Sequence, residues 1–309
     1  MNFEGYDALR NGTAWLDLSA RGKVYATGRD RARLLHNLTT NNVKQLAPGE
    51  GCYAFLLTPQ GRIQADLHIF CLEDRFLLDT EPETRERVQQ LIRKYIIADD
   101  VTLTDASDAL CEVTLEGPGS AAVLAASGAP APAKPWAHAP WDGMLVAAVS
   151  ATGQPGFRIF APAERKAELT AALEGAGAVP SSAEAARVVR LENGVPRYGE
   201  DIFETTLPQE TRQMHALHFN KGCYLGQEIV ERIRARGHVN RLLMKLLVEG
   251  VEPPVPGARV EAEGAEAGEI TSAAYSPAAG KVAALAYLRA QYARAGAALS
   301  VTGRPAVVG

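Results

Sequence analysis

The sequence has few cysteines and few aromatic residues, and it carries no large excess of charge of either sign. Only 4 of its 309 residues are cysteines, and aromatic residues make up 6%. The 32 basic and 36 acidic side chains give a formal net charge of −4. The cysteines are widely spaced and form no CxxC pair, which excludes a small disulfide-stabilised scaffold. The missing basic excess argues against a protein that coats nucleic acid.

The sequence also lacks the segments that mark export or membrane insertion. It has no run of about 18 apolar residues, the length that spans a bilayer. Its first segment, MNFEGYDALRNG, has an acidic residue at Glu4 and no apolar stretch, unlike a signal peptide. We therefore expect a cytoplasmic protein with reduced thiols and no membrane contact. The hydrophobic fraction of 47% is typical of a globular protein, and the length suggests roughly two domains.

Several common motifs for catalysis or cofactor binding are missing or incomplete. No GxSxG elbow, P-loop or HExxH motif occurs, which disfavours a serine hydrolase, a P-loop NTPase and a zinc protease. Residues 117–122 match GxGxxA, but a proline-rich stretch follows where a dinucleotide-binding fold needs a second parallel strand, so we reject NAD binding. His215, His218 and Cys223 have a spacing that fits no standard zinc framework, which leaves a metal site there as the less favoured alternative.

The hydrophobic pattern predicts an α+β protein with mostly antiparallel sheets. Residues 62–72 alternate between apolar and polar side chains, which is typical of a strand with one buried face and puts Asp66 and His68 on the polar side. Further strands surround a helix that begins near Pro82, an order typical of an α+β unit. Short strands separated by Pro and Gly turns, at 242–248, 259–261, 269–273 and 281–287, predict a small β-barrel or sandwich.

The segment Asn220–Glu228, with the sequence NKGCYLGQE, is the most informative in the chain. The pattern predicts a helix over Tyr224–Ile233, so Cys223 would lie at a helix N-terminus, where the dipole favours a thiolate. Lys221 adds a positive charge nearby. The alternative is that Cys223 is a small buried core residue.

The region around Cys223 is basic. Residues 221–245 contain six Lys or Arg and two Glu, a net +4, so the remaining residues sum to −8. A basic segment in an acidic chain suits an anionic ligand or a phosphorylated partner. A solvated helix face is the alternative.

Two acidic residues are candidates for ligand recognition. Glu192 is predicted near a helix C-terminus, where a carboxylate opposes the helix dipole. It would be better placed if it bound a ligand rich in N–H donors, such as a pterin. Asp66 could accept hydrogen bonds from a ligand or move a proton. A solvated acid is the alternative for both residues.

These motifs resemble those of a known family. KGCYLGQE at 221–228 resembles the signature of the YgfZ folate-binding family, relatives of the T-protein (aminomethyltransferase) of the glycine cleavage system. RLENGVPRYGEDI at 190–202 is similar to a segment shared with T-proteins. Residues 19–24 and 38–63 resemble the shared N-terminal half, and 268–277 resembles a motif of the C-terminal barrel.

The resemblance implies a fold of three domains in a cloverleaf around a central hole that holds tetrahydrofolate. We expect a discontinuous first α+β domain at 1–46 and 107–200. A second α+β domain would comprise 47–106 and 201–238 and include KGCYLGQE. Residues 239–309 would form the C-terminal β-barrel.

The resemblance also implies a function, namely support of iron–sulfur cluster assembly or repair in client enzymes, including radical-SAM, tRNA-modifying and other 4Fe–4S enzymes. The partner would be an A-type iron–sulfur carrier, without direct contact with nucleic acid. Cys223 would be the functional thiol and a transient cluster ligand shared with a partner, in a cleft also occupied by folate. Lys221 would be its neighbour. No permanently bound metal is expected, and an assembly factor is favoured over a turnover enzyme.

The cofactor implied by the resemblance is tetrahydrofolate or another reduced folate. The residues expected to bind it are Glu192, Asp66, Arg190, Tyr198, Tyr224 and Gln227. The alternative function is a folate-dependent aminomethyltransferase in which Asp66 assists proton movement. T-proteins have two adjacent acids in that segment and usually a second glycine, whereas this chain has Ala65 before Asp66 and Arg62 after Gly61. A non-catalytic folate sensor is a third alternative.

Overall fold

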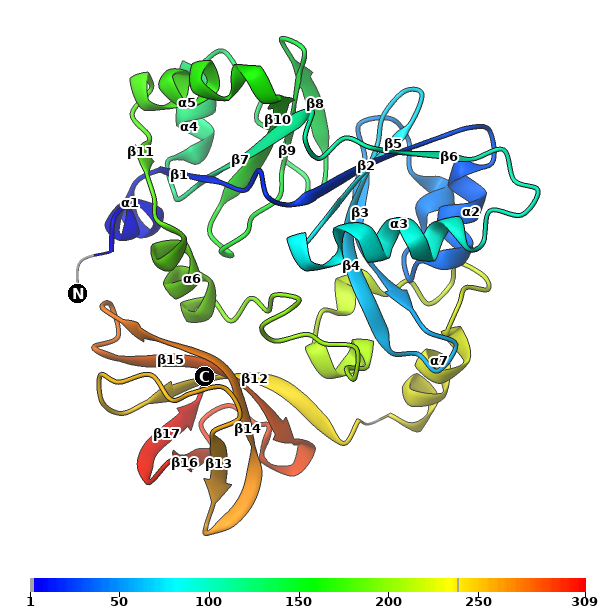
Figure 1. The fold of residues 1–309 in the computed structure, drawn as a ribbon. Coiled ribbons are helices and arrows are strands. Elements are labelled where there is room, and N and C mark those ends of the chain that lie inside the picture. The colour runs from blue at the N-terminus through cyan, green and yellow to red at the C-terminus, as the bar shows by residue number, and fades with distance from the viewer. Residues whose placement is uncertain (1–2, 238) are drawn as a thin grey trace.

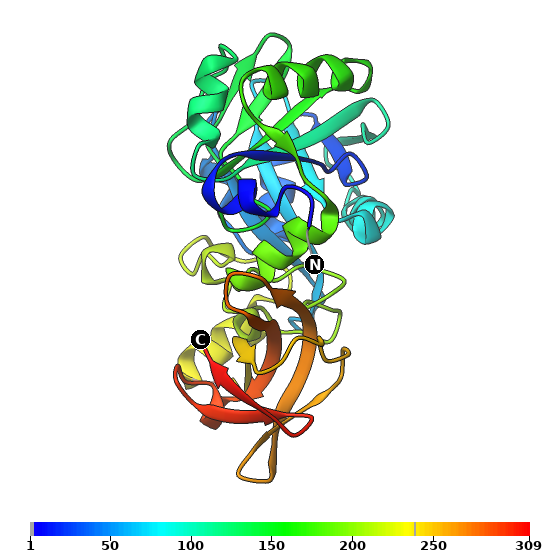
Figure 2. The same ribbon diagram turned by 90° about the vertical axis from the view of Figure 1, so that its left-hand side faces the viewer.

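The computed structural model describes residues 3–237 and 239–309, and its strands form three groups around a common centre (Figure 1). Two groups are open sheets of six and five strands, and the third is a closed barrel of six strands. The view in Figure 2 shows the barrel on one side of the molecule and both open sheets on the other. The predicted α+β fold with a C-terminal barrel is confirmed.

The six-stranded sheet has the order β11-β1-β7-β10-β9-β8, and all its neighbours are antiparallel except β1 and β11. Helices α4 (Ser120–Ala126) and α5 (Lys166–Gly175) contribute Val123, Leu124, Leu169 and Leu173 to its core. The strands are β1 (Ala14–Asp17), β7 (Leu110–Glu116), β8 (His138–Trp141), β9 (Met144–Ala147), β10 (Gly156–Pro162) and β11 (Val179–Pro180).

The five-stranded sheet is antiparallel and has the order β3-β4-β5-β2-β6. Helices α2 (Arg31–Leu38) and α3 (Arg85–Arg93) share one apolar core with it. The strands are β2 (Gly22–Thr27), β3 (Gly51–Leu57), β4 (Ile63–Cys71), β5 (Phe76–Thr80) and β6 (Thr102–Asp105). Residues 22–38 therefore lie with this sheet, whereas the family resemblance predicts them in the first domain with the rest of 1–46.

Strand β4 has the predicted alternation. Ala65, Leu67 and Ile69 are fully buried in the core beneath α2 and α3, because every second side chain of a strand points to the same face. Asp66 and His68 point to the opposite face, where they line a cavity. The period of two thus sets which side chains of this strand are available to a ligand.

The C-terminal barrel closes in the order β12-β15-β14-β13-β16-β17. Four of its strands match the predicted segments and extend them, and β16 and β17 were not predicted. Their bounds are β12 (Arg241–Val248), β13 (Arg259–Ala262), β14 (Ala265–Ser276), β15 (Lys281–Arg289), β16 (Ala298–Val301) and β17 (Arg304–Val308).

Three further α-helices complete the described part of the chain. Helix α6 (Ala183–Glu192) contacts α1 (Tyr6–Asn11) and strands β14 and β15 of the barrel. Residues 193–226 form no α-helix, and a series of turns and short 3-10 helices leads to α7 (Gln227–Arg236). Helix α7 begins three residues later than predicted, because Gly226 adopts a left-handed conformation with φ of 82° directly before it.

Candidate functional site

A central cavity of about 620 Å³ lies where the two open sheets meet helix α6 and the loop that follows it. Its wall includes side chains of β3 and β4, the loop 148–152, the loop 195–200 and one side of α6. Among the described residues, none of the barrel lines this cavity. The volume is in the range of small-molecule sites in proteins.

Asp66 of β4 provides an unsatisfied carboxylate oxygen in this cavity. The Tyr53 hydroxyl donates a 2.8 Å hydrogen bond to Oδ2, while Oδ1 is buried and has no partner among the described residues. Burial and the nearby Glu81 carboxylate raise the pKa of Asp66 from 3.8 to about 6. Buried polar atoms nearly always have a hydrogen-bond partner, so Oδ1 has the properties of an acceptor for a ligand N–H.

Four rings from distant parts of the chain form an aromatic wall beside Asp66. Trp136 stacks on His215 with ring centroids 5.3 Å apart, and Tyr53 lies 5.4 Å from His215 and 5.0 Å from His68. The indole N–H of Trp136 donates to Nδ1 of His68 at 3.0 Å. Desolvation lowers the pKa of both histidines, so they are neutral rings at pH 7. The wall therefore offers flat faces to a planar ligand.

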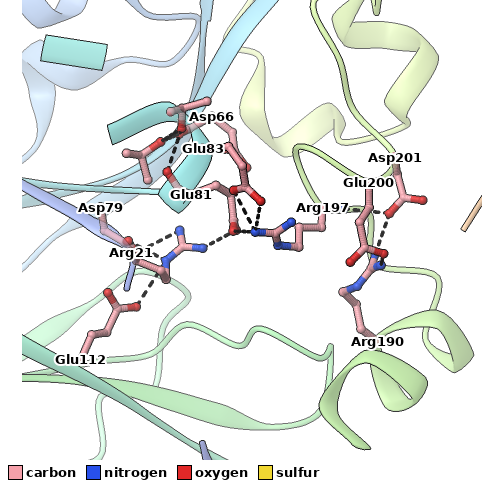
Figure 3. A network of polar contacts seen from close by, with 12 residues as sticks. Arg21, Asp66, Asp79, Glu81, Glu83, Glu112, Arg190, Arg197, Glu200 and Asp201 are labelled. Atoms are coloured by element: carbon pink, nitrogen blue, oxygen red, sulfur yellow. Dashed lines mark hydrogen bonds and ion pairs between the residues drawn. The ribbon is translucent and has the colours of Figure 1, made fainter. Parts of the chain in front are cut away.

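A buried network of charges forms the floor of the cavity (Figure 3). Nε of Arg21 donates to Asp79 at 2.7 Å, and Arg21 also pairs with Glu81, which in turn lies 2.9 Å from Arg197. Arg158 of β10 pairs with Asp79 of β5 and so joins the two open sheets. Moving the two sheets apart would break these pairs and leave uncompensated buried charges, which is unfavourable. The network therefore holds the two sheets in a fixed relative position.

Glu112 lies at the same junction, where it forms longer ion pairs with Arg21 and with Arg158, the latter at 3.5 Å. Its two carboxylate oxygens are buried and accept no hydrogen bond among the described residues, and Nε of Arg21 is 3.4 Å from Oε1. Burial and the neighbouring Asp79 raise the pKa of Glu112 to about 8. Two buried carboxyl groups therefore have elevated pKa values, Asp66 in the cavity wall and Glu112 at the junction of the two sheets.

The far end of the cavity is lined by cations from α6 and the next loop. Arg190 donates to Asp201 at 2.7 Å and to Glu200 at 2.8 Å, and Arg187 donates to Glu200 at 3.0 Å. Arg190 is buried, whereas the Arg187 side chain is 37% exposed. Arg187 is thus the guanidinium best able to exchange its carboxylate partner for an acidic ligand group.

The structure separates the other predicted folate residues from the cavity. Glu192 does not line it, because its carboxylate accepts from Tyr6, Arg10 and Ser276 and so ties α1 and the barrel to α6. Tyr198 is buried and accepts a 2.8 Å hydrogen bond from Arg87. Of the predicted folate ligands, only Asp66 and Arg190 are brought together in the central cavity.

The KGCYLGQE segment borders a second cavity of about 330 Å³ next to α2. Cys223 is exposed there, whereas Cys52, Cys71 and Cys111 are buried, so Cys223 is not a core residue. Burial lowers the pKa of Lys221 to about 7. Two expectations are corrected. Cys223 does not lie at the N-terminus of α7, which starts four residues later, and it does not line the central cavity.

Tyr224 and Gln227 belong to this second region. Tyr224 packs in an apolar cluster with Val230, and its backbone N–H donates to Oε1 of Gln227 at 3.3 Å.

Among the described residues no group of three or more His, Cys, Asp and Glu could hold a metal ion. Within the same residues no helix is long and apolar enough to cross a membrane.

Protein-family models match the chain along most of its length. The model for the GCVT N-terminal domain matches residues 4–221, and the model for the glycine cleavage T-protein C-terminal barrel domain matches residues 241–306. An aminomethyltransferase of Nostoc is 29% identical over 321 residues, which cover 98% of this chain and 85% of the relative. A putative chloroplastic transferase of Arabidopsis thaliana is also 29% identical, over 87% of this chain and 63% of the relative. The chain thus spans less than two thirds of the Arabidopsis protein.

The fold is similar to that of a solved T-protein. The glycine cleavage system aminomethyltransferase T from Bartonella henselae superimposes with a TM-score of 0.89 over 98% of this chain and 86% of that structure, at 22% sequence identity. Because the first family model covers more than half of the sequence and the second covers the barrel, this protein belongs to the glycine cleavage T-protein (GCVT) family.

Proposed function

We propose that the protein binds tetrahydrofolate or another reduced folate in the central cavity. The observation that carries the proposal is the buried Oδ1 of Asp66, an acceptor that no donor of the described residues reaches. The pterin ring of a folate has amino and ring N–H groups that can donate to such an oxygen. The chain's membership of the T-protein family, which uses tetrahydrofolate, supports the same ligand.

The walls of the cavity suit the other parts of a folate. The stacked rings of Trp136 and His215 can pack against a flat ring beside Asp66. Arg187 and Arg190 lie in the cavity wall on α6, and guanidinium groups bind carboxylates such as those of the folate glutamate tail. The cavity thus combines an acceptor, an aromatic surface and cations.

A thermal-shift titration with tetrahydrofolate under anaerobic conditions tests this proposal. Ligand at about 100 times its dissociation constant should stabilise the wild-type protein by about 2.7 kcal/mol. Asp66→Asn should lose most of this stabilisation. Asp74→Asn is the matched control, because Asp74 is an exposed carboxylate paired with Arg75 in a surface turn. Equal stabilisation of wild type and Asp66→Asn would refute the role of Asp66, and no shift with any reduced folate would refute the cavity assignment.

The physiological role that we propose for the folate-bound protein is support of iron–sulfur cluster assembly or repair, with Cys223 as the functional thiol. The exposure of Cys223 supports this role, since the other three cysteines are buried. The KGCYLGQE segment lies outside the central cavity, so a partner could reach the thiol while folate is bound. One exposed cysteine cannot hold a cluster alone, so an A-type carrier would supply further thiolates.

Complementation of a strain deficient in iron–sulfur maintenance tests this role. Cys223→Ser should abolish complementation while it leaves the thermal stability and the tetrahydrofolate shift unchanged. Asn220→Ser is a suitable control, because Asn220 is an exposed neighbour in the same loop. Full complementation by Cys223→Ser would exclude the thiol from the function.

Aminomethyl transfer from a lipoyl-bound intermediate to tetrahydrofolate is the second candidate. The aminomethyltransferases among the relatives support it, as does a carboxyl group at Asp66 that titrates near neutral pH and can therefore move a proton. In a glycine cleavage assay this candidate predicts release of methylene-tetrahydrofolate and ammonia, with loss in Asp66→Asn and no dependence on Cys223. A non-catalytic folate sensor would show folate binding and neither activity.

A further inference from the structure

The C-terminal end of α2 is capped by a residue from a distant part of the chain. The last carbonyl groups of a helix have no partner within the helix and need donors from elsewhere. Nζ of Lys221 donates to the carbonyl oxygens of Thr39 at 2.5 Å and Asn41 at 2.7 Å, and also to that of His36. The three N–H groups of one ammonium thus meet three backbone acceptors.

Three further hydrogen bonds join the same two segments. Nε2 of His36 bonds to the carbonyl oxygen of Lys221 at 2.8 Å. The backbone N–H of His218 donates to Thr40 at 3.0 Å, and that of Leu225 donates to Asn37 at 3.1 Å. The loop from His218 to Leu225 is therefore attached to the end of α2 on both sides of Cys223.

Cys223 lies at the exposed turn of this attached loop. Gly222 has φ of 95° and no neighbouring atom within 4 Å of the position of a Cβ, so the turn at Gly222 projects into open space. The next residue after Cys223 is anchored again, since Tyr224 is buried and the centroid of its ring lies 4.9 Å from Nζ of Lys221. The thiol is held between two fixed points.

We infer that Lys221 is a positioning residue, which fixes the Cys223 loop on the C-terminal end of α2 and thereby sets where the thiol is presented to a partner. This inference rests on the proposed function of Cys223. It differs from the electrostatic role predicted from the sequence, in which Lys221 only places a positive charge near the thiol. Lys44 separates the two roles, because it lines the same cavity and is exposed, and it forms no ion pair within residues 3–237 and 239–309.

The test compares Lys221→Met with Lys44→Met at about pH 6, where the Lys221 ammonium is charged. Amide hydrogen exchange at His218 and Leu225 should be about tenfold faster or more in Lys221→Met, because charge-assisted hydrogen bonds that hold the loop are lost. A nitroxide on Cys223 should give a more mobile spectrum, and the buried Cys52, Cys71 and Cys111 keep this label specific. Lys44→Met removes the same charge and should match wild type in both measurements.

Several outcomes would overturn the inference. If amide exchange and label mobility in Lys221→Met equal those of wild type, Lys221 does not anchor the loop. This conclusion holds whether or not Cys223 is the functional thiol. Equal effects of Lys221→Met and Lys44→Met would show that charge alone matters. If Lys221→Met does not fold, Lys221→Arg replaces it in the test. Arg retains the charge but cannot direct three N–H groups at these converging carbonyls, so the loop should still be more mobile than in wild type. Full complementation by Cys223→Ser together with a loosened loop in Lys221→Met would refute the proposed function and leave the anchor intact.

Discussion

Replacement of Asp66 by Asn should stabilise the ligand-free protein at neutral pH while it removes folate binding. Burial makes ionisation of Asp66 unfavourable in the folded protein, and its pKa is raised from 3.8 to about 6. The folded state therefore binds the proton more tightly than the unfolded state does. The resulting stability is present at low pH and is lost as the pH rises through about 6.

The magnitude follows from the size of this pKa shift. A shift of about two units corresponds to about 3 kcal/mol at pH values well above 6. Between about pH 7.5 and about pH 4.5 the wild-type protein should regain about 2 kcal/mol relative to Asp66→Asn, because the carboxyl group of Asp66 becomes protonated over that range. Asn remains neutral throughout, and its amide oxygen can still accept the hydrogen bond from Tyr53.

Urea denaturation of both proteins at several pH values measures this difference directly. The comparison cancels the titration of other groups, since both proteins contain them. A difference between the two free energies of unfolding that does not change with pH would refute the raised pKa of Asp66. Loss of stability in Asp66→Asn at about pH 7.5 would indicate that the carboxylate is well satisfied in the ligand-free protein.

Asp66 and Glu192 each give a further prediction. If the ionised carboxylate of Asp66 accepts an N–H of the ligand, the affinity for tetrahydrofolate measured by calorimetry should fall about tenfold per pH unit below about 6 and should be constant above about 7. Glu192→Gln should lower the free energy of unfolding by about 1–3 kcal/mol, since it removes the charged acceptor for Arg10, Tyr6 and Ser276, and it should leave the affinity for tetrahydrofolate unchanged. Loss of folate affinity in Glu192→Gln would restore the ligand role expected from the sequence.

The hydrophobic periodicity of the sequence was enough to predict strands whose side chains alternate between the core and the opposite face. Alternation in β4 placed Asp66 on the face opposite the core, because a strand repeats every two residues. Strands β16 and β17 were missed, since segments such as Ala298–Val301 are short and their alternation is weak.

Contacts between distant segments could not be predicted from spacing. Trp136 and His215 are 79 positions apart in the sequence, yet they stack in the cavity because the connection before β8 crosses to the five-stranded sheet. His215 was noticed only as a possible metal ligand, and Trp136 lies beside Pro135 in an alanine-rich connection that gave no sign of a ligand site. Glu192 ends its helix as predicted, but its partners come from α1 and the barrel. For the same reason the anchor between Lys221 and the end of α2, more than 180 positions apart, could not be foreseen.

Folate binding in the central cavity is tested most directly by a structure of the protein crystallised anaerobically with tetrahydrofolate. We expect the folate in the central cavity, with a ring N–H or amino group within hydrogen-bonding distance of Oδ1 of Asp66 and a flat ring against Trp136. A folate bound elsewhere, or one whose donors do not contact Asp66, would contradict the proposed binding site.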